Sequence, residues 1–432
     1  MVEIVTEPTE SPSLFFVGDV AKIDDSWDSL PLDPAVQSFI DEADFALANL
    51  EGSLPTGDAI SKQGPNLEID RTTLTRLDQM GFDGVSLANN HVMDFGVEGM
   101  RSTIEACQEV GLDTVGAGED SRDAIDPIRC EIDGTSVGIF AVSEHEELNA
   151  TSSAPGTSWA RTPTIAAEIE RLSRGFDISI LVPHGGIEYV PIPPPAWRRL
   201  LRGFASLSID AVIAHHPHCP QGWEVFEGTP IFYSLGNFMM LSRWYPASKR
   251  SFGIEVTLDE SGVSNFNLAP FEVDEPHVRK VVFCQIDDFH KYLHQTTETL
   301  SNNYEYDRMW NSLSNYLYNT NYQSKIDDFG RSFPSSLLSN PVRALDRLTK
   351  WCFFGCAQKQ HEQAVRDILS NESHRDVIKI VLEENLDSTR AEGERADFPV
   401  PDEWYPYYDG RQTRRWMQRQ IFRIKKVMSR LT

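Results

Sequence analysis

Six side chains in the first 220 residues of this sequence carry donor atoms that divalent metal ions prefer. They are Asp19, Glu51, Asn90, His184, His216 and His218. Imidazole nitrogen and carboxylate oxygen bind zinc, manganese and iron, and two such ions about 3.5–4 Å apart can clamp both oxygens of a displacement reaction. A dinuclear centre also needs a carboxylate that bridges the ions. We therefore predict that these residues bind one or two divalent ions of Mn, Fe or Zn.

Two further residues lie close to the candidate ligands in the sequence. His91 directly follows Asn90, so its imidazole is placed to protonate a leaving oxygen as a general acid. Asp94 has two interpretations: its carboxylate fixes the tautomer of His91, or it is an acid at the start of the helix expected at residues 97–110. His91 and Asp94 are the candidate catalytic residues.

The candidate substrate-binding residues are polar side chains within or beside the same motifs. They are Asn49, Glu188, Tyr189, His215, Gln221 and Asn237. Asn237 is either a pocket wall or a turn residue with positive φ. His215 either takes part in the chemistry or packs and hydrogen-bonds beside the ligands. Glu188 and Tyr189 either line the cleft or belong to a rigid surface loop made by the prolines at residues 191–195.

Each motif follows the carboxyl end of an apolar run that is typical of a buried strand. These runs are residues 14–17, 45–50, 84–88, 178–182, 210–214 and 230–235. Helical patterns alternate with the runs, which indicates a βα fold. These patterns lie at residues 71–80, 97–110 and 197–207. Open α/β sheets bind ligands at the carboxyl ends of their strands, so we expect the motifs to meet at one edge.

The pattern changes in the second half of the chain. Residues 252–258 and 263–268 are predicted as strands without an intervening helix, as if they close a second sheet. We expect a first domain over residues 1–275 and a helical accessory region over residues 285–432. Helical patterns in that region lie at 287–328, 341–359 and 361–385, followed by a Pro/Asp/Tyr-rich linker at 392–410.

Residues 411–432 form a basic tail with six arginines, two lysines and no acidic residue. Apolar residues interleave with these cations. One interpretation is an amphipathic helix on an anionic membrane surface, through which the protein contacts the membrane or a polymer synthase. The other is a C-terminal helix docked on the acidic body of the same protein.

The composition is strongly acidic, with 65 Asp and Glu against 39 Lys and Arg and a net charge of −26. Only 11 of the basic residues are lysine. Such a surface suits a cytosol of high ionic strength, so we expect a halophilic source, the alternative being an acidic mesophilic protein. Nucleic acid is excluded as a partner of the main domain because it requires a basic surface.

The compartment is predicted from what the sequence lacks. The first ten residues carry three glutamates and no basic residue, unlike a secretory signal, and no run has the roughly 18 consecutive apolar residues of a membrane span. The six cysteines have no framework spacing and are expected to be reduced thiols. We expect a cytoplasmic protein, with peripheral contact at the inner membrane face if the tail binds lipid.

The order and spacing of the motifs resemble the capsule-synthesis CapA family, whose members are also called poly-γ-glutamate synthesis proteins. The resemblance covers roughly residues 13–240 and rests on Gly18-Asp19, Asn49-Leu50-Glu51, Ser86-Leu87-Ala88-Asn89-Asn90-His91-x-x-Asp94-x-Gly96, His184-Gly185-Gly186-x-Glu188-Tyr189, His215-His216-Pro217-His218-x-x-Gln221-Gly222 and Tyr233-Ser234-Leu235-Gly236-Asn237-Phe238.

That family is a branch of the calcineurin-like metallophosphoesterases. The resemblance implies a metallophosphoesterase-like α/β fold, a four-layer αββα sandwich, here with a mainly helical C-terminal extension. It also implies that Asp19 holds a first metal, that Glu51 bridges and that Asn90 holds a second metal. His91 would face the leaving group. The three histidines of the other two motifs, His184, His216 and His218, would complete the coordination.

Three residues depart from the pattern that the resemblance implies. The wider superfamily has a histidine two residues after the first aspartate, and here that position is Ala21. Glu51 stands in place of an aspartate, which lengthens the bridging arm. Gly185 stands where the family usually has tryptophan, and we expect it to widen the mouth of the pocket.

The leading hypothesis is a metal-dependent, phosphoesterase-like hydrolase in the biosynthesis of a capsule or exopolymer, either poly-γ-glutamate or a surface polysaccharide. Its partner would be an anionic polymer or a phosphorylated precursor. The alternative is a non-catalytic factor for polymer assembly or export that keeps the metallophosphoesterase fold. Ala21 favours the alternative, and the pairing of His91 with Asp94 favours catalysis.

Overall fold

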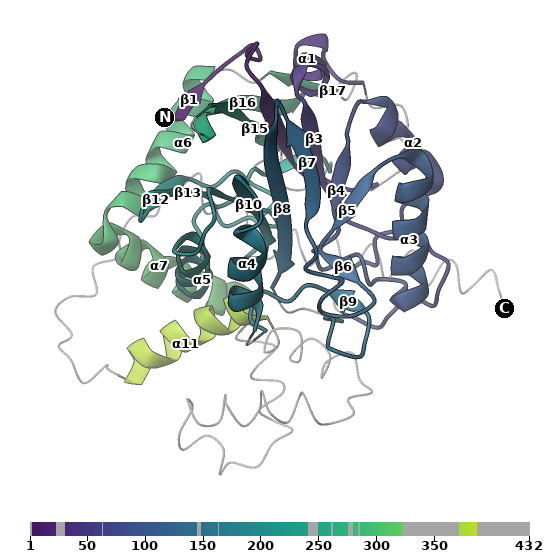
Figure 1. The fold of residues 1–432 in the computed structure, drawn as a ribbon. Coiled ribbons are helices and arrows are strands. Elements are labelled where there is room, and N and C mark those ends of the chain that lie inside the picture. The colour runs from purple at the N-terminus through teal and green to yellow at the C-terminus, as the bar shows by residue number, and fades with distance from the viewer. Residues whose placement is uncertain are drawn as a thin grey trace.

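The apolar runs of the sequence form two β-sheets that pack face to face (Figure 1). The computed structural model describes residues 2–22, 31–62, 64–144, 148–162, 164–240, 249–260, 262–274, 280–283, 286–322 and 371–386. Within these residues the larger sheet has nine strands. Seven of them run in the order β1 (Val2–Ile4), β16 (Gly262–Asp274), β15 (Arg250–Asp259), β2 (Ser13–Val20), β3 (Phe45–Leu50), β4 (Gly84–Ser86) and β5 (Asp113–Val115). Beside this path, β14 (Asn237–Met239) pairs with β2, and β17 (Lys280–Phe283) pairs with β16.

The smaller sheet has six strands in the described part of the chain. Their order is β12 (Trp223–Phe226), β13 (Thr229–Phe232), β11 (Ala211–Ile213), β10 (Ile178–His184), β8 (Thr135–Ser143) and β7 (Ile128–Ile132). A separate short ladder joins β6 (Ala117–Gly118) to β9 (Gly156–Thr157). The centre of each large sheet is parallel, and β10 is buried along its whole length, as expected of strands covered on both faces.

The strands predicted at residues 252–258 and 263–268 exist, but the prediction that they close a second sheet is wrong. They form β15 and β16, and β15 pairs antiparallel with β2 in the sheet that also holds β3 and β4. The local pattern shows that a segment is extended. It does not show which distant edge the segment joins, because that is decided by the packing of both faces.

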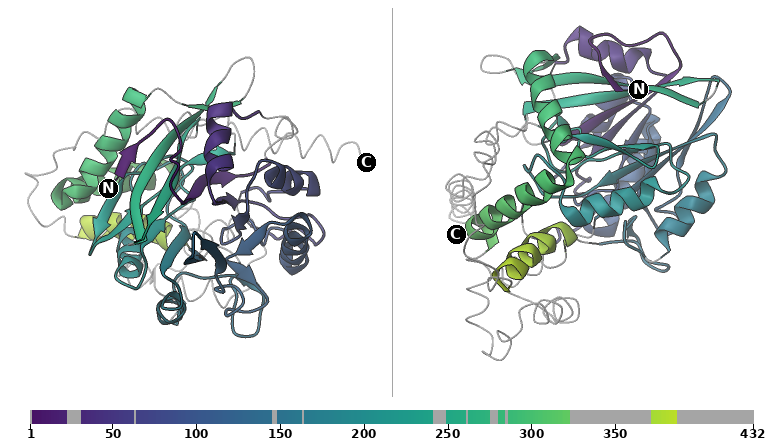
Figure 2. Two further views of the ribbon diagram at one scale, coloured as in Figure 1. Left: turned by 45° about the horizontal axis from the view of Figure 1, so that its top comes forward. Right: turned by 90° about the vertical axis from the view of Figure 1, so that its left-hand side faces the viewer.

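Helices cover the outer face of each sheet, which makes four layers (Figures 1 and 2). On the larger sheet these are α1 (Pro34–Glu42), α2 (Arg71–Gln79) and α3 (Gly96–Val110). On the smaller sheet they are α4 (Ile165–Ser173), α5 (Pro195–Ala205), α7 (Asn303–Leu317) and α11 (Glu372–Leu386). A third apolar cluster, including Phe16, Ile180 and Ile254, fills the space between the sheets. The four-layer αββα sandwich is confirmed.

The helical pattern at residues 287–328 corresponds to α6 (Ile286–Ser301), α7 and a π-helical turn, η3 (Tyr318–Tyr322). Part of the pattern at 361–385 corresponds to α11. Trp310 of α7 and Val377 of α11 are buried in the same cluster as Trp197 of α5, so these helices share the outer layer of the smaller sheet (Figure 2).

Several predictions for the second half are not tested by this arrangement. The helix at 341–359, the linker at 392–410 and the basic tail at 411–432 lie outside the described residues, and the division of the chain into domains stays a prediction. In the described ranges no helix is long and apolar enough to cross a membrane.

Candidate metal centre

The ends of the central strands bring the predicted motifs together between the two sheets. Asp19 lies near the end of β2, opposite Asn49 of β3 in the parallel register. His184 is the last residue of β10 and pairs with His215 across an isolated bridge. β14 runs parallel to the end of β2 and places Asn237 opposite Asp19. Residues from both sheets therefore reach one point.

The close approach of β14 to β2 requires glycine at position 18. The amide of Asp19 donates a hydrogen bond to the carbonyl of Gly236 over 3.0 Å. A Cβ atom on Gly18 would lie 1.8 Å from that same carbonyl oxygen. The Gly-Asp motif thus combines a residue without a side chain, for contact, with a carboxylate, for chemistry.

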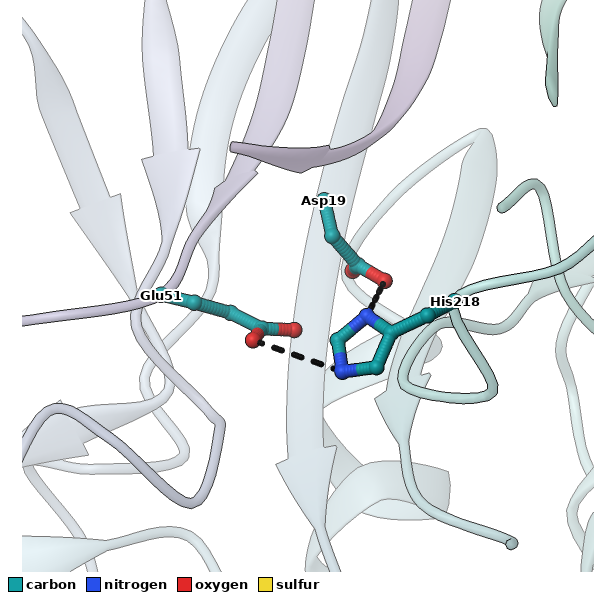
Figure 3. Close-up of side chains that lie close together, drawn as sticks. All are labelled: Asp19, Glu51 and His218. Carbon is teal, nitrogen blue, oxygen red and sulfur yellow. Dashed lines mark hydrogen bonds and ion pairs between the residues drawn. The ribbon is translucent and has the colours of Figure 1, made fainter. Parts of the chain in front are cut away.

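Asp19, Glu51 and His218 form a fully buried cluster whose candidate ligand atoms all lie within 4.8 Å of one another (Figure 3). Nδ1 of His218 lies 3.2 Å from Oδ2 of Asp19, and its Nε2 lies 3.9 Å from Oε2 of Glu51. Oε2 of Glu51 has no hydrogen-bond partner in the described part of the chain. A buried, unpartnered carboxylate oxygen beside a second carboxylate and an imidazole fits a divalent metal site.

A second cluster lies on the other side of Glu51. Nε2 of His184 is 3.1 Å from Oδ1 of Asn90 and 3.1 Å from Nδ1 of His216. Oε1 of Glu51 is 3.7 Å from the same nitrogen of His184. One oxygen of Glu51 thus faces each cluster, which is the arrangement of a bridging carboxylate.

The buried titratable groups of the first cluster shift one another's pKa values. Burial and the negative charge of Asp19 raise the pKa of Glu51 well above its usual value. Although burial opposes it, the charge of Glu51 and the hydrogen bond to Asp19 raise the pKa of His218 to about 10. Burial alone would raise the pKa of Asp19, but the hydrogen bond to His218 outweighs burial and lowers that pKa. The three side chains therefore influence one another's protonation, and a divalent cation at this point would neutralise the carboxylates.

The second cluster is electrically different. Burial and the neighbouring His216 lower the pKa of His184 well below its usual value, and burial and His218 lower the pKa of His216 to about 4. Both imidazoles are neutral at neutral pH, which is the form that offers a lone pair to a metal ion.

His91 is held by two charged residues of opposite sign. Its Nδ1 lies 2.8 Å from Oδ2 of Asp94 and 3.1 Å from Nζ of Lys62. Lys62 also forms a salt bridge with the other oxygen of Asp94 and donates to the carbonyl of Asn90 over 2.9 Å. Burial and the charge of Lys62 lower the pKa of His91 to about 4, against the opposing charge of Asp94.

Lys62 gives no signal in the sequence. Its side chain is only 4% exposed, yet it lies in the middle of the long polar loop between β3 and α2, far from the strand end, so neither periodicity nor motif spacing marks it. A lysine in such a loop is normally solvated. The amide of Leu67, in the same loop, donates to Asp94 over 2.6 Å and completes the surroundings of that carboxylate. Asp94 contacts His91 rather than serving only as a helix-end acid.

Two of the predicted substrate-binding residues contact candidate ligands directly. The amide nitrogen of Asn49 lies 2.9 Å from Oδ1 of Asp19 and 3.2 Å from Nδ1 of His184, so it connects the two clusters. Oδ1 of Asn237 lies 3.0 Å from Nδ1 of His218. Both side chains are fully buried. Their contacts orient candidate ligands.

The other predicted substrate-binding residues surround the clusters at different depths. The ring of Tyr189 lies 5.6 Å from that of His218, and the partly exposed Glu188 is near enough to raise the pKa of His218. Two buried side chains bind main-chain carbonyls instead. Nε2 of His215 lies 3.0 Å from the carbonyl of Val17, and Gln221 donates to that of Val190 over 2.6 Å.

The backbone is strained at three residues of the site. His216, His218 and Tyr189 have φ values of 102°, 54° and 61°. The remaining non-glycine residues with positive φ in the described ranges, Asp133 and Glu227, each precede a glycine in a strand-connecting turn. Residues with side chains rarely adopt this conformation outside turns, and where they do it often serves a functional site.

Ala21, which departs from the superfamily pattern, and Gly185, which departs from the family pattern, have structural consequences. Ala21 is fully buried in an apolar cluster with Leu67 and Met240, so it leaves no donor atom on that side of Asp19. A Cβ atom on Gly185 would lie 2.8 Å from the ring of Trp197. The expected widening at Gly185 is therefore wrong, because Trp197 of α5 already fills the space.

A small hollow lies next to Asn90 of the second cluster. Its lining includes Met93, Leu148, Asn149 and Thr157, together with the carboxylate-bearing Glu144. Asn90 is partly exposed, whereas His184 is buried behind it.

Comparisons with known proteins agree with this geometry. A family model described as "Bacterial capsule synthesis protein PGA_cap" matches residues 13–242. The PGA biosynthesis protein CapA of Bacillus subtilis is 28% identical over 275 residues, which cover 61% of this chain and 72% of that protein. The capsule biosynthesis protein CapA of Bacillus anthracis is 26% identical over 274 residues, covering 61% and 66%.

Among solved structures, a novel phosphatase from Mycoplasma pneumoniae overlaps distantly, with 12% identity and a TM-score of 0.41 over 62% of this chain and 95% of that one. The family match is the stronger finding because it spans all six candidate metal ligands. The chain therefore belongs to the bacterial capsule synthesis protein PGA_cap family.

Proposed function

We propose that this protein is a metal-dependent, phosphoesterase-like hydrolase that acts in the biosynthesis of poly-γ-glutamate or a related capsule polymer. The observation that carries the proposal is the position of Glu51. Its two oxygens face two separate donor clusters, and one of them has no hydrogen-bond partner among the described residues. A buried carboxylate in that position has an evident use if it bridges two cations.

The first ion would be held by Asp19, His218 and Glu51, and the second by Asn90, His184, His216 and Glu51. Bound divalent ions would supply Lewis acidity to a phosphoryl or related ester. Neutral imidazole and carboxylate are donors for Mn, Fe or Zn, and the set does not discriminate among them. Asn49 would orient Asp19 and His184 relative to each other, because its side-chain amide nitrogen contacts both.

The chain's own contribution to bond cleavage would come from His91. Its Nδ1 is engaged by Asp94 and Lys62, which leaves Nε2 to face the leaving oxygen. Asp94 and Lys62 fix the ring plane, and Lys62 also holds the carbonyl of the candidate ligand Asn90. Since the lowered pKa leaves the ring neutral, His91 would present its single proton on Nε2 to the leaving oxygen, with Nδ1 accepting from Lys62.

Metal analysis and turnover test this proposal together. The purified full chain should contain or take up manganese and hydrolyse bis-p-nitrophenyl phosphate when manganese is present. His216→Ala should lose both properties, and His294→Ala, which removes an exposed histidine of α6, should lose neither. If wild type neither binds metal nor turns over the substrate, and so cannot be distinguished from His216→Ala, the proposed hydrolase function is wrong.

A second candidate is a non-catalytic factor for polymer assembly or export. The apolar surroundings of Ala21 favour it, because the first cluster offers fewer donors than the superfamily pattern implies. This factor would bind one metal ion, or an anionic polymer, without hydrolysing an ester. Metal binding with no turnover of any phosphoester, together with retention of poly-γ-glutamate on the protein, would select this candidate.

The proposed partner is an anionic polymer or a phosphorylated precursor, with contact to a membrane or a polymer synthase through the tail at residues 411–432. The charge of that tail supports this proposal, since it is basic on an otherwise acidic chain. Co-sedimentation with anionic liposomes, with and without residues 411–432, tests it. Equal sedimentation of both proteins would remove the membrane from the proposal.

A further inference from the structure

The loop between β10 and α5 carries the backbone away from His184, and downstream helices hold it. The carbonyl of Pro193 accepts hydrogen bonds from the hydroxyl of Tyr306 over 2.8 Å and from the indole of Trp310 over 2.6 Å. The amide of Ala196, in the first turn of α5, donates to Asp376 of α11 over 2.7 Å. Helices α7 and α11 thus fix the far end of this loop.

Glu144 fixes its near end. One oxygen of its carboxylate accepts the amide of Gly186 over 3.0 Å, two residues after His184. The other accepts the amide of Ser373 over 2.9 Å, in the first turn of α11, and the Ser373 hydroxyl donates to both oxygens. Both side chains are buried, at 4% and 0% exposure. A carboxylate at a helix N-terminus is also favoured by the helix dipole.

The same loop supports the other histidines. The amide of Tyr189 donates to the carbonyl of Pro217 over 2.7 Å, and Gln221 donates to the carbonyl of Val190. Pro217 lies between His216 and His218, whose backbones both have positive φ. A strained backbone keeps its conformation only when its surroundings hold it, and this loop provides part of that support.

We propose that Glu144 is a positioning residue of the metal centre, joining the backbone after His184 to the N-terminus of α11. The inference rests on the proposed function insofar as it concerns metal binding. It gives the C-terminal helices a role that the sequence does not indicate: they hold the loop on which the histidine ligands depend. Outer residues that orient metal ligands commonly change metal affinity about 10- to 100-fold when they are replaced.

Titration calorimetry of the full chain with manganese chloride tests this role. Glu144→Gln, which keeps the size and one acceptor oxygen, should weaken manganese binding about tenfold, and Glu144→Ala should weaken it further, toward 100-fold. Ser373→Ala should show a smaller effect in the same direction. The control is Asp33→Ala, which removes a hydrogen-bonded cap from α1 in the opposite layer. It should lower stability and leave manganese affinity unchanged.

A second readout does not depend on metal. Amide hydrogen exchange of residues 185–190 in the metal-free protein should be faster in Ser373→Ala than in wild type, and unchanged in Asp33→Ala. If wild type binds no manganese, the proposed function fails, and unchanged exchange would overturn the positioning role separately. If wild type binds manganese and the variants at Glu144 and Ser373 bind it equally well, the positioning role fails while the proposed function stands.

Discussion

Glu51 is a carboxylate buried away from water, and its two oxygens face different partners. Its raised pKa means that the metal-free protein keeps it protonated at pH values where an ordinary glutamate is charged. A cation that binds at its place must displace that proton. Metal affinity at this residue should therefore increase with pH.

Replacing Glu51 by glutamine tests this description. Because the folded-state pKa lies above the ordinary 4.5, wild type without metal loses stability as pH rises from about that value. The amide of the variant mimics the protonated acid and carries no such cost. In EDTA, the Tm of Glu51→Gln should equal or exceed that of wild type, with the difference growing from about pH 5 to about pH 8.

Manganese should reverse the order of the two Tm values, so that wild type becomes more stable than Glu51→Gln. A ligand at 100 times its Kd stabilises the folded state by about 2.7 kcal/mol, so it should raise the Tm of wild type and leave Glu51→Gln unmoved. Glu260→Gln, in an exposed turn, is the matched control and should behave as wild type. An equal rise in Tm for wild type and Glu51→Gln would contradict the assignment of Glu51.

Lys62 compensates the buried charge of Asp94. Lys62→Met leaves that carboxylate with His91 and a backbone amide alone, so the free energy of unfolding should fall by about 3–5 kcal/mol. Adding Asp94→Asn should restore part of the loss. Urea unfolding of the single and double variants measures both effects.

The control for Lys62 is a similar pair that water reaches. Lys22 pairs with Asp70, whose side chain is 46% exposed, so Lys22→Met should cost less than about 1 kcal/mol. Equal losses in the free energy of unfolding for Lys22→Met and Lys62→Met would show that the buried pair stabilises the fold no more than the exposed pair does.

The candidate ligands could be predicted from the sequence because each of them ends or follows an apolar strand. Lys62 could not, and neither could the contacts of Glu144, although Glu144 directly follows the apolar strand β8. Lys62 lies in a loop without periodicity, and Glu144 owes its contacts to Ser373, 229 residues away. Residues that act through another residue leave no local pattern, because their partners come from tertiary packing.

The parallel strands at the centre of each large sheet could be predicted from the sequence, because strands buried on both faces form continuous apolar runs. The run at 45–50 coincides with β3, for example. Short edge elements such as β1 and β12 give no comparable signal. The sheet that β15 joins depends on its pairing with β2, more than 230 residues earlier, which no local pattern contains.

At the element scale, Gly18 sets the distance between β2 and β14. Gly18→Ala places a Cβ atom against the carbonyl oxygen of Gly236, so the strands must separate. We expect a loss of about 1–3 kcal/mol in the free energy of unfolding. We also expect weaker manganese binding, because Asn237 moves away from the cluster.

The matched control is Gly203→Ala on α5, where a Cβ atom meets nothing within 4 Å. This variant should be stabilised by about 0.5–1 kcal/mol, since alanine favours a helix. Thermal unfolding compares the two proteins. A neutral effect of Gly18→Ala would mean that the contact between β2 and β14 is looser than described.

For the whole molecule, the net charge of −26 produces self-repulsion that salt can screen. The Debye length falls from about 10 Å at 0.1 M to about 3 Å at 1 M. The Tm of the full chain should therefore rise when sodium chloride is increased over that range. A flat or falling Tm would show that the surface charges are spaced widely enough not to destabilise the fold.

The link between Glu144 and Ser373 has a consequence for synthesis of the protein. All six candidate ligands emerge from the ribosome before residue 220, but α11 follows about 150 residues later. A nascent chain that has completed both central sheets still lacks the partner that holds Gly186. The candidate metal centre should therefore mature only late in translation, after the residues that hold its loop have been made.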